Sequence, residues 1–246
     1  MELKNKVVVV TGSSSGIGKR TAIRFAKEGA KVVVHYGINK KGGEETVEEI
    51  KKLGGGAFLV QAEMTKAEEI EKMFKEIVEK YKTIDILINN AAKPSEITPF
   101  FESSQKDILD LLNMNVVGAM LCSKQVIPIM KANGGGKILN TSSIKGCEYG
   151  GGSVTYAVSK AAINSFTKTL AKQVAPEILV NAVAPGYVKT RVYDDVSEEK
   201  IKKWLDGTYL KRWVTEDEIA DAFIFLAKND AMTGQVIYVD AGFTLK

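Results

Sequence analysis

Short apolar runs rich in β-branched residues alternate with amphipathic stretches along the chain, and this alternation constrains the fold more than any other feature. The runs predict strands at Lys6–Val10, Lys31–Tyr36, Ala57–Gln61, Ile84–Ile88, Lys137–Thr141, Leu179–Ala184 and Gln235–Val239. Their nearly continuous Val, Ile and Leu content is typical of strands buried on both faces. The sequence therefore predicts one α/β domain, residues 1–246, with a seven-stranded parallel sheet and helices on both faces.

The stretches between the strands predict helices with one apolar face. These helices are expected near Ile17–Glu28, Gly43–Leu53, Lys66–Tyr81, Gln105–Ala132, Thr155–Ala175 and Glu216–Lys228. A long irregular stretch, from Tyr187 to Trp213, contains only a short helical pattern around Ser197–Leu205. A stretch of this length inside a compact domain is usually functional.

Composition excludes several classes of partner. The net charge is only +4, and basic residues are mixed with acids, which argues against nucleic acid and membrane surfaces. Cys122 and Cys147 are too few for a disulfide framework, and with a single histidine they also make a metal site improbable. The apolar run in the opening MELKNKVVVVTG is too short for a signal peptide, and no run approaches transmembrane length. We expect a cytoplasmic protein.

The first predicted strand leads directly into the segment TGSSSGIG, Thr11 to Gly18, and a helix follows. At a strand-to-helix turn, glycines let the backbone approach a pyrophosphate and let the helix pack on the strand. The free N–H groups of the helix N-terminus then face the phosphates. This context predicts a dinucleotide site, and the alternative is a glycine-rich turn without a ligand.

Several motifs in the chain occur together in a characteristic order. The glycine segment reads T-G-x-x-x-G-x-G, and it is followed by NNAA at 89–92, NVVG from Asn115, Ser143, the Tyr156/Lys160 pair and NAVAPG at 181–186. With this set, the whole chain resembles the short-chain dehydrogenase/reductases. The resemblance implies a Rossmann fold and an NAD(P)-dependent oxidoreductase that interconverts a ketone and a secondary alcohol. The closest pattern is that of the 3-oxoacyl-(acyl-carrier-protein) reductases, with glucose dehydrogenase-like members next.

Tyr156 and Lys160 lie one helical turn apart, so their side chains share a face. A neighbouring ammonium stabilises tyrosinate, which predicts that the pKa of Tyr156 is lowered toward neutrality. Such a tyrosine is a proton donor and acceptor matched to neutral pH. Taken alone, a Tyr–Lys pair at this spacing is often only a helix surface, so the prediction depends on the other motifs.

Ser143 follows a predicted strand at its carboxyl end, where α/β sheets bind ligands. Thr141 and Ser142 are also hydroxylated, and Ser143 is chosen because its spacing to Tyr156 matches the family. The resemblance implies that Ser143 binds the substrate carbonyl, that Tyr156 delivers the proton, and that Lys160 also holds the nicotinamide ribose.

Asn115 interrupts an apolar helical pattern, and asparagine disfavours helix interiors. This predicts a local kink or a functional contact. Asn113 is the competing position. The resemblance implies that Asn115 holds a water that connects Lys160 to solvent.

The resemblance also implies which residues contact the cofactor. They are Gly12, Ser14, Ser15, Gly16, Ile17, Gly18, Tyr36, Glu63, Asn90, Ala91, Tyr156, Lys160, Pro185, Gly186, Val188 and Thr190. Within this set, Val188 and Thr190 hold the carboxamide, and Glu63 replaces a common adenine-contacting aspartate. The segment at approximately 187–213 would be a lid over the substrate.

The end of the second strand bears on the choice of nicotinamide. NAD selectivity usually requires an acid there, and this chain has Tyr36 instead. We therefore expect NADP, with NAD possible. The arginines that often bind the extra phosphate are missing, and Asn39, Lys40 and Lys41 are the candidates to replace them. His35 is expected beside the adenosine ribose rather than as a catalytic base.

The partners expected from the sequence are a small ketone or alcohol and further copies of this chain. Basic residues that would dock an acyl carrier protein are not clearly placed, so use of a carrier protein stays open, and a sugar or polyol dehydrogenase is the alternative. A non-catalytic nucleotide-binding protein on this fold is a third possibility. The long helices Gln105–Ala132 and Thr155–Ala175 carry more apolar surface than one sheet face needs, and the family pairs these helices between subunits, so we expect a homotetramer.

Overall fold

The computed structural model describes residues 1–94, 99–147, 153–189 and 196–245. Within this part of the chain, a parallel sheet of seven strands has the order β3-β2-β1-β4-β5-β6-β7. The strands are β1 (Val7–Val10), β2 (Lys31–Tyr36), β3 (Gly56–Gln61), β4 (Ile86–Asn89), β5 (Gly136–Thr141), β6 (Ile178–Pro185) and β7 (Val236–Val239). The predicted α/β class and parallel sheet are confirmed.

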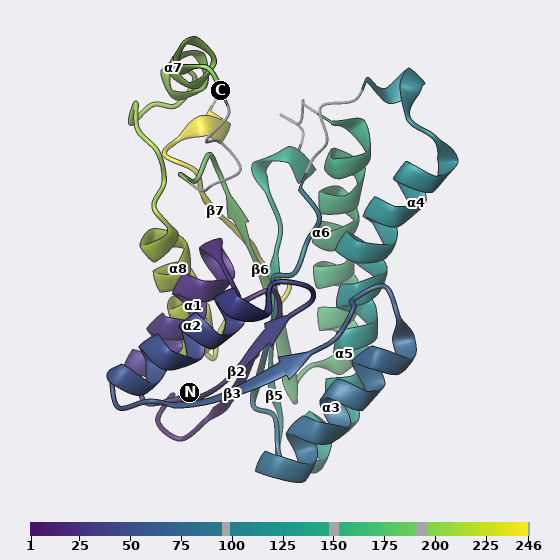
Figure 1. The fold of residues 1–246 in the computed structure, drawn as a ribbon, viewed down its shortest axis with the longest axis vertical. Helices are drawn as coiled ribbons and strands as arrows, with labels where there is room; N and C mark the ends of the chain where they lie inside the picture. Colours follow the sequence, from purple (N-terminus) through teal and green to yellow (C-terminus); the bar gives the residue numbers. More distant parts are fainter. Residues whose placement is uncertain (95–98, 148–152, 190–195, 246) are drawn as a thin grey trace.

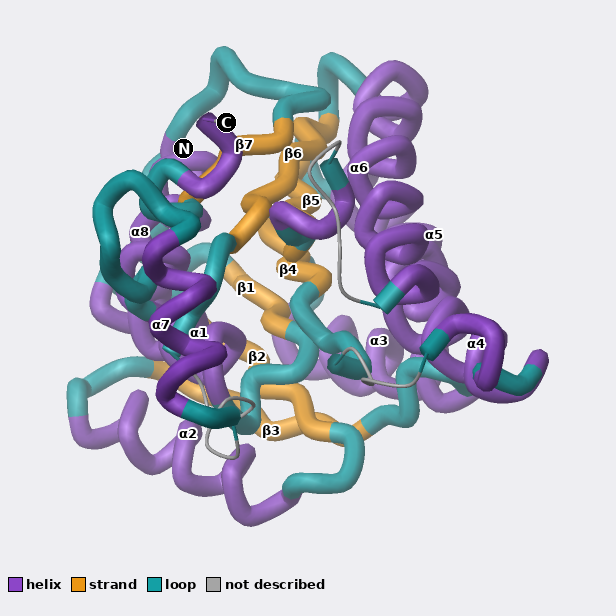
Figure 2. The backbone as a smooth tube through the Cα atoms, turned by 90° about the horizontal axis from the view of Figure 1, so that it is seen from above, coloured by secondary structure: helices purple, strands orange, loops and turns teal. Residues whose placement is uncertain are grey.

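Eight α-helices are assigned among the described residues. They are α1 (Gly16–Lys27), α2 (Lys40–Lys52), α3 (Ala67–Tyr81), α4 (Gln105–Leu112), α5 (Gly118–Ala132), α6 (Val154–Val174), α7 (Glu198–Asp206) and α8 (Glu216–Lys228). Helices α1, α2 and α8 cover one face of the sheet, and α3, α5 and α6 cover the other (Figures 1 and 2).

The four consecutive valines of β1 show why the strands read as continuous apolar runs. Val8 and Val10 belong to the core beneath α1 and α8, whereas Val7 and Val9 belong to the core beneath α3, α5 and α6. Successive side chains of a strand point to opposite faces, so a strand covered on both sides needs apolar residues at every position.

The predicted helix Gln105–Ala132 is wrong as a single α-helix. A π-helical turn, Asn113–Val117, separates α4 from α5, and Asn115 lies buried within it. The asparagine thus marks an irregular turn within the predicted helix. Turns of this kind inside α-helices are frequent at functional sites.

The start of α2 also differs from the prediction. It begins at Lys40 rather than at Gly43, because the side chain of Asn39 caps it by accepting a hydrogen bond from the Gly42 N–H at 3.0 Å. The Gly-Gly pair disfavours a helix by propensity, but the cap offsets part of that cost.

The order of the strands positions the site. The chain proceeds outward from β1 to β2 and β3, then returns to the other side of β1 for β4. Ligands of open parallel sheets bind at the carboxyl ends of the strands, where the direction reverses. Here that place is the edge where β1, β4 and β5 end.

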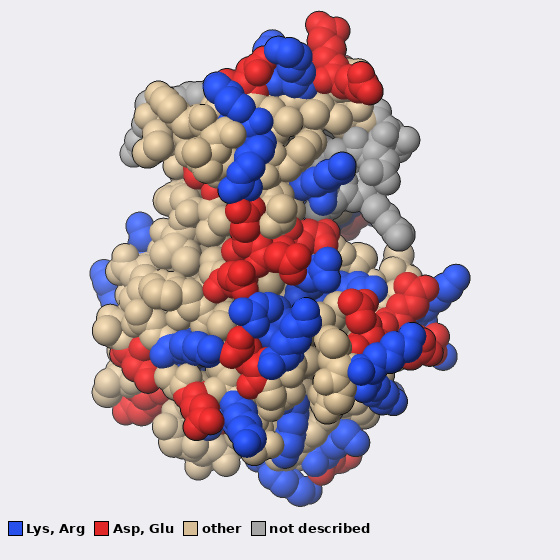
Figure 3. All heavy atoms as spheres, turned by 90° about the vertical axis from the view of Figure 1, so that its left-hand side faces the viewer, with Lys and Arg blue, Asp and Glu red and all other residues tan. Residues whose placement is uncertain are grey.

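The outer surface over α1, α2 and α8 mixes charges of both signs, as Figure 3 shows. Pairs such as Lys19–Glu49, Arg24–Asp221 and Lys228–Glu28 connect these helices. No helix among the described residues is long and apolar enough to cross a membrane.

Candidate active site

The glycine segment forms a cradle that larger residues would fill. Gly12 has φ +65°, and a Cβ there would lie 2.8 Å from the Cα of Ala91. A Cβ on Gly18 would lie 2.3 Å from the carbonyl oxygen of Gly12. Ser15, at the N-cap of α1, makes no side-chain capping bond, so the first N–H groups of the helix remain open to the cleft. A close backbone turn with free N–H groups fits a pyrophosphate.

The side chain of His35 holds this turn in place by hydrogen bonding. Its Nδ1 accepts a hydrogen bond from the Gly12 N–H at 2.9 Å, and its Nε2 lies 2.9 Å from the carbonyl oxygen of Ala62. The ring is therefore neutral with its proton on Nε2, and burial lowers its pKa. His35 lines the cleft as expected, but its two bonds also give it a structural role that the sequence did not predict.

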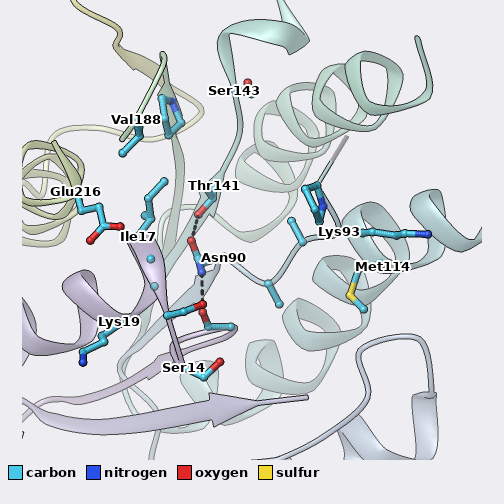
Figure 4. Close-up of a pocket in the computed structure, with 18 of the residues that line it drawn as sticks. Ser14, Ile17, Lys19, Asn90, Lys93, Met114, Thr141, Ser143, Val188 and Glu216 are labelled. Atoms are coloured by element: carbon cyan, nitrogen blue, oxygen red, sulfur yellow. Dashed lines mark hydrogen bonds between the residues drawn. The ribbon is translucent and has the colours of Figure 1, made fainter. Parts of the chain in front are cut away.

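Asn90 joins three segments at the centre of the site (Figure 4). Its Nδ2 donates to the carbonyl oxygens of Thr11 at 3.0 Å and Gly12 at 3.3 Å, and its Oδ1 accepts from the hydroxyl of Thr141 at 3.4 Å. Thr11 in turn accepts from the N–H groups of Asn90 and Ala91. The end of β4 is thereby attached to the glycine segment on one side and to β5 on the other.

A cleft of about 1560 Å³ opens along this edge. Most of the residues predicted to contact the cofactor line it: Gly12, Ser14, Ser15, Gly16, Ile17, Gly18, Glu63, Asn90, Ala91, Tyr156, Lys160, Pro185, Gly186 and Val188. Tyr36 does not line the cleft; its ring lies against Gly43 of α2 instead. Thr190 lies outside the described residues.

Ser143 is the hydroxylated residue left available to a ligand. The Thr141 hydroxyl donates to Asn90, and the Ser142 hydroxyl donates to Asn164. Ser143 lines the cleft, accepts from the Lys145 N–H at 3.2 Å, and hydrogen bonds to Tyr156. The hydrogen-bond partners therefore distinguish Ser143 from Thr141 and Ser142, which the sequence pattern alone could not do.

Lys160 lies beneath Tyr156, and both side chains are deeply buried. The Lys160 Nζ donates to the carbonyl oxygen of Thr141 at 2.9 Å and lies 5.6 Å from the centre of the Tyr156 ring. Burial lowers the pKa of Lys160 to about 8. Burial also raises the pKa of Tyr156, and the hydrogen bond from Ser143 opposes this rise. The predicted lowering of the Tyr156 pKa is wrong for the protein chain alone, because burial outweighs the hydrogen bond from Ser143.

Asn115 lies behind the cleft rather than on its wall. Its Oδ1 accepts from the Lys93 N–H at 2.7 Å, and its Nδ2 donates to the Lys93 carbonyl at 3.2 Å and to the Ser159 hydroxyl at 3.2 Å. Ser159 donates to the carbonyl of Tyr156 at 2.7 Å. Asn115 therefore connects the segment after β4 to the turn of α6 that carries Tyr156.

A family model described as enoyl-(acyl carrier protein) reductase matches residues 12–244, which includes the glycine segment except its first residue, Thr11. The chain belongs to the short-chain dehydrogenase/reductase family. As a member, it is an NAD(P)-dependent oxidoreductase that acts on CH–OH groups and interconverts a ketone and a secondary alcohol.

Three relatives illustrate the likeness. The 3-oxoacyl-(acyl-carrier-protein) reductase FabG of Staphylococcus epidermidis is 36% identical over 243 residues, 97% of this chain and 98% of that protein. A 7α-hydroxysteroid dehydrogenase complexed with NADH and 7-oxo glycochenodeoxycholic acid superposes with a TM-score of 0.92 at 32% identity, covering 98% and 95% of the two chains. An actinorhodin polyketide ketoreductase with NADPH gives a TM-score of 0.91 at 30% identity, covering 97% of each chain.

The family pattern did not predict every residue at the site. Glu216 lines the cleft beside Gly16, and burial raises its pKa. Lys145 also lines the cleft, together with Tyr187 and Trp204 of the predicted lid segment. The signal for Lys145 was present in the sequence, since a lysine two residues after Ser143 stands next to the expected carbonyl-binding position.

Proposed function

We propose that this short-chain dehydrogenase/reductase uses NADPH to reduce the ketone of a 3-oxoacyl thioester to a secondary alcohol. The observation that carries the proposal is the placement of Tyr156, Ser143 and Lys160 together at the end of β5, on the cleft that the glycine segment opens. The likeness to 3-oxoacyl-(acyl-carrier-protein) reductases supports this substrate class.

In this proposal, the hydroxyl of Ser143 donates a hydrogen bond to the ketone oxygen, and the hydroxyl of Tyr156 transfers its proton to that oxygen. Bound NADPH supplies the hydride that reaches the carbonyl carbon. Lys160 stabilises the tyrosinate that remains, since an ammonium held close in a buried site interacts strongly with a nearby anion. Asn115 connects the turn of α6 that carries Tyr156 to the segment around Lys93. A water bound beside Asn115 is part of the proposed proton path.

The cleft contains residues suited to each part of the dinucleotide. The open N–H groups at the start of α1 fit the pyrophosphate, and Lys160 is placed to hold the nicotinamide ribose. Pro185, Gly186 and Val188 line the cleft at the end of β6, where the resemblance assigns the carboxamide.

The preference for NADPH is supported by the end of β2. No acid ends this strand, and Lys41, in the first turn of α2, lines the cleft. Of the other two candidates for the extra phosphate, Asn39 caps α2, and Lys40 pairs with Glu44 at 3.6 Å. Glu49 also lines the cleft but pairs with Lys19 at 3.0 Å. The same assay that measures turnover should therefore show a lower KM for NADPH than for NADH.

Three further expectations belong to the proposal. A homotetramer is supported by the exposed apolar side chains of Leu109 on α4, Met120 on α5 and Val158 on α6, and sedimentation at micromolar concentration tests it. A cytoplasmic location rests on the two free cysteines, and cell fractionation tests it. The lid at approximately 187–213, of which residues 190–195 lie outside the described residues, is supported by the stacking of Tyr187 on Trp204 of α7, at 5.3 Å between ring centres.

The variant Tyr156→Phe tests the reaction. It removes the hydroxyl and leaves the ring, so binding of NADPH, followed by fluorescence, should be unchanged. Turnover of acetoacetyl-CoA should fall by about 10² to 10⁴-fold, the range for loss of a general acid. Tyr81→Phe, at the end of α3 and not among the residues that line the cleft, is the matched control and should keep its activity. Turnover retained in Tyr156→Phe would contradict the assignment.

A further inference from the structure

Lys145 is a half-buried lysine in the cleft whose role the proposed reduction does not explain. It belongs to the short 3₁₀ turn Ile144–Gly146, directly after Ser143, and its backbone N–H donates to the Ser143 hydroxyl. Its side chain lines the same cleft. The ammonium therefore lies in the part of the cleft where the ketone is proposed to bind.

Aromatic rings, not carboxylates, surround this ammonium. The Lys145 Nζ lies 3.4 Å from the hydroxyl oxygen of Tyr187, 5.4 Å from the centre of that ring and 5.6 Å from the centre of the Phe243 ring. No salt bridge joins it to an acid among the described residues. Cation–π contacts of this kind compensate only part of the lost hydration of an ammonium.

The nearby titratable groups do not neutralise Lys145. The thiol of Cys147 donates to the carbonyl of Ile144. Asp240 accepts from the N–H groups of Gly242 and Thr244 and from the Thr244 hydroxyl. Burial lowers the pKa of Lys145, which reflects an ammonium without a nearby counter-ion.

The charges along the cleft are unevenly distributed. Its carboxylates are Glu45, Glu49, Glu63 and Glu216. Glu216 lies beside the glycine segment, away from Ser143 and Lys93 in Figure 4. The lining residues next to Ser143 and the Tyr187–Trp204 stack instead include Lys145 and Lys200 and, among the described residues, no acid. A cleft lined by one sign of charge attracts ligands of the opposite sign.

We propose that Lys145 is a specificity-determining residue that binds a carboxylate on the substrate, close to the ketone that is reduced. The inference rests on the proposed ketone reduction and adds a second substrate beside the 3-oxoacyl thioester, a free 3-oxo acid, which is preferred over its neutral oxygen ester. A carboxylate supplies the charge-assisted hydrogen bond that the aromatic rings cannot. Tyr187, which contacts the ammonium and stacks on Trp204, forms the adjoining wall.

Steady-state kinetics with acetoacetate and with ethyl acetoacetate test this proposal, because the two share a ketone and differ in charge. The wild type should have the lower KM for acetoacetate. Lys145→Met should raise that KM by about 10 to 100-fold, the loss expected for a charge-assisted hydrogen bond, while KM for the ester changes less than about twofold. Lys145→Arg should retain most of the affinity. Lys203→Met, on the exposed part of α7, is the control and should match the wild type.

The proposal would be overturned if Lys145→Met raised KM equally for acetoacetate and for the ester, or left both KM values unchanged. A lower KM for the ester than for acetoacetate in the wild type would overturn it as well. If Lys145→Met raises the KM for acetoacetyl-CoA but not for acetoacetate, Lys145 binds a phosphate of the coenzyme, and the proposed carboxylate site is overturned.

A separate readout does not depend on turnover. Acetoacetate binding should change the fluorescence of Trp204, which stacks on Tyr187, in a saturable way in the wild type. The change should be lost in Lys145→Met. If no ketone or thioester is reduced, the proposed function fails, and this titration still decides the carboxylate site: identical titrations in the two proteins would refute it.

Discussion

Replacing Lys160 with methionine should make the protein more stable and nearly inactive. The side chain is only 3% exposed, and within the part of the chain that the structure describes its one hydrogen bond goes to the carbonyl oxygen of Thr141. Burial lowers its pKa from 10.5 to about 8, which corresponds to roughly 3 kcal/mol at neutral pH for holding the charged form. Loss of the hydrogen bond to Thr141 destabilises the variant by about 1 kcal/mol. The net gain is about 2 kcal/mol, or roughly 4 to 8 °C in Tm for a chain of this length.

The pH dependence of this gain has a defined sign. The folded state releases the Lys160 proton near pH 8, whereas the unfolded state keeps it to about 10.5. Between these values the unfolded state binds more protons, so the stability of the wild type rises with pH. The advantage of Lys160→Met should therefore be constant below pH 8 and shrink as the pH rises toward 10.5.

Lys137 offers a matched control, because it is a second buried lysine with a different environment. It is 1% exposed, and its Nζ donates to the carbonyl oxygens of Asn229 at 2.5 Å and Leu226 at 3.4 Å, with Asp230 at 2.7 Å. Lys137→Met leaves these carbonyls at the end of α8 without a partner, so it should destabilise by about 2 to 4 kcal/mol.

Differential scanning calorimetry of the two variants and the wild type at pH 7, followed by the same scans at pH 9.5, measures both effects. Activity is assayed below the lowest Tm, where Lys137→Met should be active and Lys160→Met inactive. A Tm for Lys160→Met at or below that of the wild type would refute the reasoning, because it would mean that the buried ammonium stabilises the fold. An advantage that does not change with pH would refute its attribution to the proton on Lys160.

Two further predictions concern the glycine segment. Gly18→Ala should weaken NADPH binding at least about tenfold and lower the Tm, since its Cβ would lie 2.3 Å from a backbone oxygen that cannot rotate away, and overpacking typically costs about 1 to 3 kcal/mol. Gly56→Ala, where the nearest atom is 3.9 Å away, should bind NADPH normally; equal affinities would contradict the cradle. Protonation of His35 removes the acceptor for the Gly12 N–H, and burial lowers the pKa of His35 below 6.5. The neutral His35 ring therefore contributes its full stabilisation above pH 6.5, and this stabilisation is lost as the pH falls through the pKa of His35 in the folded state. The nearby Glu63 opposes the lowering of this pKa. His35→Asn keeps an acceptor that does not titrate in this range, so its Tm should fall less than that of the wild type between pH 7 and pH 5; parallel curves would contradict the role of His35.

The sequence predicted the parts of this structure that depend on local pattern. The Val, Ile and Leu runs located the strands because a doubly covered sheet requires apolar residues at every position. The start of α2 was missed because the Asn39 cap competes with the propensity of two glycines. The direction of the Tyr156 pKa was missed because burial is a tertiary property that a four-residue spacing does not contain. The same holds for His35, whose partner Gly12 is 23 residues away.

Buried asparagines of β4 and β5 fix the positions of α5 and α6 relative to the sheet, which apolar packing alone would not do. The Nδ2 of Asn89 donates to Asn140 at 2.9 Å and to Ser123 of α5 at 3.1 Å, and Asn140 donates to Thr167 of α6 at 2.9 Å. Apolar contacts alone allow helices to slide, whereas hydrogen bonds are directional and costly to break in a buried site. These bonds attach α5 and α6 to adjacent strands. Because α6 carries Tyr156 and Lys160, the network determines where they stand relative to Ser143.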